Sequence, residues 1–177
     1  MGELLAFDWA TGGERVSIQE ACLRLALAIV LSGLVGIDRE LKHKPLGLRT
    51  NMMVALGAAS FSLMTMHLVH VLGTGPTEIQ IDPGRVMEAV VGALGFLGAA
   101  AIIQSRFELF GATTGASIWV VGGIGMACGF GFYQIAVAVT VAGVFVLTVL
   151  GMITGRGRPD REEQPAPERE QPQRIRR

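Results

Sequence analysis

Residues 36–51 read Gly-Ile-Asp-Arg-Glu-Leu-Lys-His-Lys-Pro-Leu-Gly-Leu-Arg-Thr-Asn and separate two long apolar runs, 21–37 and 52–72. A single membrane-spanning helix needs about 20 apolar residues to cross ~30 Å of hydrocarbon, so each run can hold a span. The polar stretch between them carries more Lys and Arg than Asp and Glu. Because Lys and Arg near span ends are retained on the cytoplasmic side, this stretch predicts an inside loop.

The composition indicates an integral membrane protein. Of the 177 residues, 50% are hydrophobic and 24 are Gly, and no Asp, Glu, Lys or Arg occurs in residues 111–155. A chain of this size has too little polar surface to bury so long an uncharged segment in a soluble fold. The two cysteines both lie in apolar runs and indicate neither a disulfide framework nor a metal site. The acidic N-terminus lacks the basic segment of a cleavable signal peptide, so none is expected.

The apolar runs predict an all-α fold, a polytopic transmembrane helix bundle of about five spans. The expected spans are residues 18–37, 50–72, 82–104, 113–130 and 135–153. The expected organisation is an extracytoplasmic N-terminal segment (1–17), a transmembrane domain (18–154) and a cytoplasmic tail (155–177). The tail is rich in Arg, carboxylates and Pro, which predicts disorder. The basic residues of the polar stretch, the loop at Arg106 and the tail place the N-terminus outside and the C-terminus inside.

Several residues inside or beside the spans have competing interpretations. We interpret Arg24 as snorkelling to the surface or pairing with Glu20, with a role in a transport path as the alternative. His67 and His70 are interpreted as interfacial side chains, the alternative being a metal site. We expect Cys128 to be a small buried hydrophobe rather than a reactive thiol.

Glycines and turn residues predict how the later spans begin and pack. Asp82 followed by Pro83 is typical of a helix start, with an N-cap carboxylate and proline at the first helical position. The small residues of the third and fourth spans predict close helix–helix contacts. The fifth span is rich in Val, Leu and Phe, so we expect it to face lipid more than the fourth.

Three stretches together resemble the MgtC/SapB family of bacterial inner-membrane proteins. They are Gly36-Ile-Asp-Arg-Glu-Leu with Gly47-Leu-Arg-Thr-Asn-Met-Met-Val-Ala-Leu-Gly-Ala-Ala, then Asp82-Pro-Gly-Arg leading to Gly95-Phe-Leu-Gly-Ala, then Thr113-Thr-Gly-Ala-Ser-Ile-Trp-Val and Gly125-Met-Ala-Cys-Gly-Phe-Gly-Phe-Tyr. The chain departs from the family pattern at Asp38, where Glu is usual, and at Ala100 and Ala101, where a small residue and Thr are common. The MgtC branch also continues into a soluble C-terminal domain after the membrane spans. In this sequence the expected tail, residues 155–177, occupies that position.

The resemblance implies a non-enzymatic membrane protein linked to adaptation to low magnesium and, in pathogens, to survival inside host cells (virulence). We therefore expect an accessory or regulatory protein of magnesium homeostasis. The lack of acidic residues within the spans favours this over transport, because a Mg²⁺ path is expected to offer oxygen ligands, often carboxylates. The alternative is a small channel or transporter for Mg²⁺ or another ion. We expect no enzymatic activity, cofactor, metal site or nucleic-acid partner; the expected partners are the lipid bilayer and another membrane protein or a second copy.

The candidate functional residues combine polar positions of the family motifs with charges near the span ends. We expect a paired network at the inner membrane face, formed by Asp38, Arg39, Glu40 and Arg49, because charges near the bilayer are costly unless paired or hydrated. The full candidate set is Asp38, Arg39, Glu40, Arg49, Thr50, Asn51, Asp82, Arg85, Thr113, Thr114 and Cys128. In the transport alternative, the candidates from Asp38 to Asn51 line the inner mouth of a path through the membrane. Its outer mouth is then lined by Asp82, Arg85 and Glu88.

Overall fold

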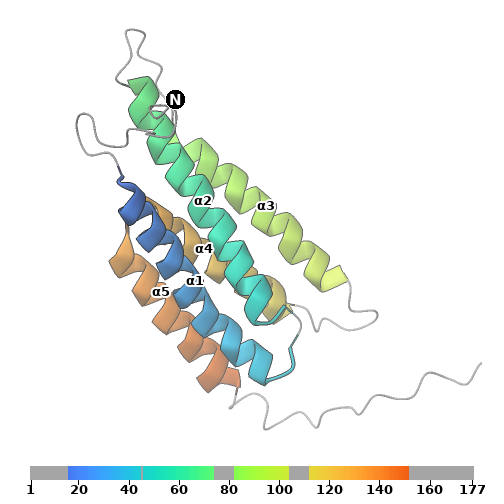
Figure 1. Cartoon of the computed structure of the whole chain (residues 1–177). Coiled ribbons are helices and arrows are strands. Elements are labelled where there is room, and N and C mark those ends of the chain that lie inside the picture. The colour runs from blue at the N-terminus through green and yellow to red at the C-terminus, as the bar shows by residue number, and fades with distance from the viewer. Residues whose placement is uncertain (1–15, 45, 74–81, 104–111, 152–177) are drawn as a thin grey trace, which may run out of the picture.

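The computed structural model describes residues 16–44, 46–73, 82–103 and 112–151. Across these ranges the chain forms an all-α bundle, as predicted (Figure 1). The helices are α1 (Ile18–Leu41), α2 (Leu48–Gly73), α3 (Pro83–Ile103), α4 (Ala112–Phe130) and α5 (Tyr133–Phe145), which continues as the π-helix η1 (Val146–Leu150). The N-terminal segment and the tail lie outside the described residues.

The helices have the length and composition of membrane spans. Four of them pass both criteria: Ile18–Leu41, Leu48–His70, Pro83–Ile102 and Ala112–Phe130. The fifth apolar segment, Tyr133–Val149, is shorter. A helix rises 1.5 Å per residue, so the 19 residues of α4 extend about 28 Å, close to the hydrocarbon thickness. The chain is therefore a polytopic membrane protein.

One predicted boundary is wrong. The first span was expected to end at residue 37, but α1 continues to Leu41 and includes Asp38, Arg39 and Glu40. Lys42, the C-cap residue of α1, pairs with Asp38 one turn earlier, so the last turn of the helix carries its own charge compensation.

Helix α4 lies at the centre of the bundle and contacts all four other helices. In Figure 1 it runs behind α1 and α2, with α3 on one side and α5 on the other. Of its span 61% is buried, against 17% for α3. The close helix–helix contacts predicted for the glycine-rich fourth span are thereby confirmed.

Small residues bring the backbones of α4 and α2 into direct contact. A Cβ atom added at Gly125 would lie 2.2 Å from the Ala55 carbonyl oxygen, and one at Gly129 would lie 2.5 Å from that of Ala59. The two residues in each helix are four apart, so both pairs lie on the same faces. Such small residues let membrane helices pack closely without a hydrophobic driving force.

Helices α3 and α5 lie at the outside of the bundle, and the predictions of their exposure and packing are met to different extents. In α5 only Ala136 and Thr140 are buried, which confirms that the fifth helix faces outward more than the fourth. Helix α3 begins at Pro83 as predicted, and the Asp82 carboxylate accepts a 2.8 Å hydrogen bond from the Gly84 amide. Only part of the small-residue face of α3 is packed: Gly98 lies against Gly115 of α4, whereas nothing lies within 4 Å of a Cβ added at Gly92.

Candidate functional site

The end of the bundle where α1 finishes and α2 and α4 begin is called here the Arg39 end; the opposite end is the Arg24 end. The link between α1 and α2 is tight. The amide of His43 donates to the Glu40 carbonyl and that of Lys44 to the Arg39 carbonyl. His43 and Leu46 both have positive φ, at 50° and 57°, so the chain reverses within a few residues.

Arg39 is the central side chain of this end. It is 3% exposed, although it ends a membrane span. Its Nε donates to the Leu46 carbonyl at 3.1 Å and its Nη2 donates to the Thr114 hydroxyl at 2.6 Å. Thr114 is itself buried in the first turn of α4. The guanidinium thus joins α1 to the α1–α2 link and to α4.

Asn51 completes the same cluster from α2. It is 2% exposed, and its side-chain amide donates to the Leu46 and Gly47 carbonyls, both at 2.7 Å. The Leu46 carbonyl therefore accepts from both Arg39 and Asn51. These two polar side chains fix the entry of α2, and burying them is tolerable because they are hydrogen-bonded.

The acidic residues of the predicted network have other roles. The Glu40 carboxylate accepts a 3.0 Å hydrogen bond from the Leu48 amide, which caps the start of α2. Asp38 pairs with Lys42 and also accepts a 3.0 Å hydrogen bond from Thr148 in η1. Asp38 thus belongs to a second cluster that includes Lys42, which the predicted network left out.

The remaining candidates at this end lie apart from the Arg39 cluster. Arg49 is exposed on the first turn of α2, and Thr50 is partly buried beside it. Thr113 is exposed next to the buried Thr114. Cys128 lies toward the opposite, Arg24 end of α4, fully buried in the core with Ala55, Ala59 and Ile124, which confirms its interpretation as a small buried hydrophobe.

At the Arg24 end, the structure confirms the ion-pair interpretation of Arg24, and it also buries the side chain, which snorkelling to the surface would not. Arg24 is 7% exposed and forms the predicted ion pair with Glu20. It also donates from Nη1 to the Gly129 carbonyl at 2.9 Å and to the sulfur of Met66 at 3.5 Å. Its guanidinium carbon lies 6.0 Å from the ring centroid of Tyr133. Arg24 therefore ties α1 to α2 and to the last turn of α4.

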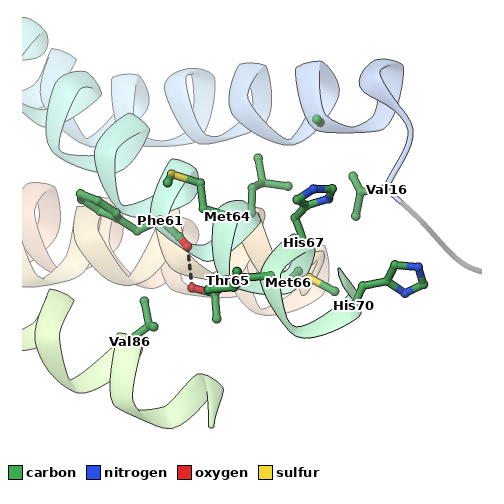
Figure 2. Close-up of a pocket in the computed structure, with 11 residues that line it drawn as sticks. Val16, Phe61, Met64, Thr65, Met66, His67, His70 and Val86 are labelled. Atoms are coloured by element: carbon green, nitrogen blue, oxygen red, sulfur yellow. Dashed lines mark hydrogen bonds between the residues drawn. The ribbon is translucent and has the colours of Figure 1, made fainter. Parts of the chain in front are cut away.

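The remaining candidates of the Arg24 end are not gathered around Arg24. Asp82 and Arg85 are exposed at the start of α3. His67 and His70 line an apolar pocket of about 490 Å³ (Figure 2), together with Val16, Ala21, Phe61, Leu63, Met64, Thr65, Met66, Leu68 and Val86. The hydroxyl of Thr65 donates to the Phe61 carbonyl of its own helix, so it adds little polarity to this pocket. Within the described ranges, no group of three or more His, Cys, Asp or Glu side chains is placed to hold a metal.

The chain is similar to known proteins over about three quarters of its length. The chain is 34% identical over 138 residues to the "Putative magnesium transporter YhiD" of Escherichia coli K12. The aligned residues make up 77% of this chain and 63% of that protein. It is 37% identical over 128 residues to the protein MgtC of Salmonella typhimurium (72% of this chain and 51% of that protein). It is 37% identical over 133 residues to MgtC of Brucella abortus, covering 75% and 50%.

The chain thus spans about half to two thirds of the length of these relatives. No solved structure matches it. The family model that matches it covers residues 25–156, which include all five helices except the first residues of α1. Both the Arg39 cluster and the central α4 lie inside this matched region. The chain belongs to the MgtC family.

Proposed function

We propose that this protein is a non-enzymatic accessory or regulatory protein of magnesium homeostasis in the inner membrane of a bacterium. Membership of the MgtC family and the similarity to YhiD support a membrane function related to Mg²⁺. The finer choice, regulator rather than transporter, rests on the charges inside the bundle.

The observation that supports regulation over transport is the sign of the buried charges. They are both cationic, and one lies at each end of the packed core. Arg24 and Arg39 are buried on the same face of α1, one at each end of its contact with α2 and α4. In the described part of the chain, no Asp or Glu is classed as buried. A Mg²⁺ path would need oxygen ligands to replace part of the hydration shell, and two guanidinium groups on its axis would repel the ion.

The core between these arginines is also closed to water. Residues of α1, α2 and α4 fill it, and backbone contacts at Gly125 and Gly129 leave no space for a hydrated ion. Such packing suits a protein that acts by contact with another membrane protein or a second copy. The open side of α3, where Phe96 is 79% exposed, offers a surface for that contact.

Transport and regulation can be separated by two measurements. The first is Mg²⁺ flux into sealed liposomes that contain purified, correctly inserted protein. The second is growth in low-Mg²⁺ medium of a bacterium whose own MgtC-family gene is deleted. Regulation predicts no flux together with restored growth, and Arg39→Ala should restore growth less well than Lys44→Ala. Saturable flux that depends on Asp38 or Glu40 would refute the regulatory function.

The proposed orientation places the Arg39 end in the cytoplasm, because the Lys and Arg of the α1–α2 link lie there. Cysteines introduced one at a time at position 43 and position 77, in a Cys22→Ser background whose remaining Cys128 is buried, test this with an impermeant maleimide applied briefly to intact cells. The orientation predicts labelling at 77 and protection at 43. Labelling at 43 alone would reverse it.

A further inference from the structure

Helix α3 packs on the bundle through one face. Leu94 is buried against Gly122 of α4, and Gly98, one turn later in α3, lies against Gly115. Figure 1 shows α3 at the edge of the bundle, with the other helices on one side of it. The opposite face, half a helical turn from Leu94, therefore points away from the rest of the described chain.

The outward face of α3, called here the Phe96 face, combines one protruding aromatic ring with an adjacent gap. Phe96 is 79% exposed. In the described part of the chain, nothing lies within 4 Å of a Cβ added at Gly92, so the ring stands one turn away from open space. The other exposed residues of this face are Arg85, Glu88, Ala89, Ala93 and Ala100.

Arg85 and Glu88 give the Phe96 face two opposite charges. Both side chains are exposed near the start of α3, and within the described ranges neither forms an ion pair with its own chain. Charges close to the end of a span are costly unless they are paired or hydrated. A surface that carries one cation and one anion, three residues apart, is complementary in charge to a second surface of the same kind.

We propose that the protein forms a dimer in which the Phe96 faces of two copies pack together about a two-fold axis along the membrane normal. Two copies inserted in the same orientation have their α3 helices parallel, so each residue lies near its own equivalent. The Phe96 ring of each copy then fills the gap beside Gly92 of the partner subunit. Arg85 of each copy faces Glu88 of the partner subunit, so both contacts occur twice.

This face favours a second copy over lipid alone or a different protein. Membrane helices associate through close packing and polar contacts, because lipid tails leave no hydrophobic driving force between them. A ring beside a gap packs closely only against a surface of complementary shape, and here one face supplies both parts. The two charges likewise satisfy each other across a two-fold axis. A foreign helix would have to match the ring, the gap and both charges independently.

The first test is cysteine cross-linking of the full chain in bacterial membranes, in a Cys22→Ser background whose remaining Cys128 is buried. Ala89→Cys places a thiol on the Phe96 face, and copper phenanthroline oxidises two such thiols to a disulfide if the faces meet. The matched control is Ala26→Cys, an exposed alanine of α1 near the same end of the bundle. The dimer predicts cross-linking of Ala89→Cys at least about tenfold faster, because pairing raises the effective concentration of the thiols. Equal rates would overturn it.

Exchanging the charges tests the facing of Arg85 and Glu88 separately from folding. Arg85→Glu brings two carboxylates together across the axis and Glu88→Arg brings two guanidinium groups together, so each variant should cross-link about fivefold more slowly than its parent. Expressed together with different tags, the two variants should form the mixed dimer in preference to either homodimer, because both facing pairs are then attractive. Unchanged rates in both single variants, or no preference for the mixed dimer, would contradict the proposal.

Filling the gap tests the packing of Phe96. Gly92→Leu occupies space that is open in the single copy, and Gly57→Leu on α2 is the matched control, because nothing in the described part of the chain lies within 4 Å of a Cβ added there either. Gly92→Leu should slow the cross-linking of Ala89→Cys about tenfold, whereas Gly57→Leu should leave it unchanged. Equal effects of the two variants would refute the packing. Cross-linking of Ala89→Cys only to a different membrane protein would refute the dimer as well.

The dimer goes beyond the proposed function and fails independently of it. A chain that gives no Ala89→Cys cross-link, yet restores growth in low Mg²⁺, refutes the dimer and leaves the regulatory function in place. A chain that cross-links as expected, but carries Mg²⁺ flux or does not restore growth, leaves the dimer in place and refutes the regulatory function.

Discussion

The contact between α2 and α4 makes a sharp prediction for Gly125→Ala. The added Cβ would lie 2.2 Å from the Ala55 carbonyl oxygen and 2.8 Å from its Cα, both backbone atoms that no side-chain rotation can move away. Contacts of this kind below 3.0 Å do not persist, so the two helices must separate by at least about 0.8 Å. Overpacking of this kind costs about 1–3 kcal/mol, and the cost should lie at the upper end here.

The matched control is Gly123→Ala, two residues earlier in the same helix. Nothing lies within 4 Å of a Cβ added there, so this change keeps the gain in helix propensity, up to about 1 kcal/mol, without the clash. Gly125→Ala gains the same propensity, which leaves a net loss of about 2 kcal/mol. The two variants should therefore shift stability in opposite directions.

Cys128 provides the assay, because its thiol is fully buried in the native bundle and is exposed only when α4 separates from its neighbours. In a Cys22→Ser background, the rate of maleimide labelling at Cys128 reports this opening. A loss of about 2 kcal/mol raises the rate about thirtyfold, at tenfold for each 1.36 kcal/mol. Equal rates in Gly125→Ala and Gly123→Ala would refute the backbone-contact argument.

Three further predictions concern the buried polar side chains, all measured as the free energy of unfolding in mixed detergent micelles. Arg39→Ala should cost about 2–4 kcal/mol, because a buried hydroxyl and a carbonyl lose their donor, and Lys44→Ala should cost less than about 0.5 kcal/mol; similar losses would contradict the assignment. Asn51→Asp should cost more than Asn51→Ala, because a carboxylate cannot donate to the two carbonyls that Asn51 binds. A smaller loss in the Asp variant would show that the amide bonds contribute little. Arg24→Met should cost about 1–3 kcal/mol by leaving the Gly129 carbonyl without its side-chain donor, whereas the conservative Arg24→Lys should recover part of this. Full recovery by Lys would mean that charge, not the forked geometry, matters there.

Hydropathy predicted the helices well, because membrane spans are encoded directly by the length of apolar runs. The bounds of α2, α3 and α4 lie within about two residues of those expected. The end of α1 was missed because charged residues usually mark the end of a span. Here Asp38 and Lys42 pair along the helix, and Arg39 turns inward to Thr114.

The functional site was predictable only in part. Arg39, Asn51 and Thr114 were candidates, but their grouping depends on which helices are neighbours, and hydropathy carries no such information. For Arg24 the pairing with Glu20 was predicted, but its contact with Gly129 was missed because Gly129 is 105 residues away in the sequence. A usable signal for the burial of Arg24 was the row of small residues that follows it at intervals of four on α1. Ala28 and Ser32 are buried on the same face as Arg24.

The two buried arginines also determine when the protein can complete its insertion. In a chain that has emerged only as far as α3, the partners that α4 supplies, the Thr114 hydroxyl for Arg39 and the Gly129 carbonyl for Arg24, have not yet been synthesised. Until α4 arrives, Arg24 has only Glu20 and the sulfur of Met66 as partners, and Arg39 has the Leu46 carbonyl, so each guanidinium lacks one of its hydrogen-bond acceptors in the bundle. The arrival of α4 therefore completes the hydrogen bonding of both buried arginines at once, one at each end of the bundle.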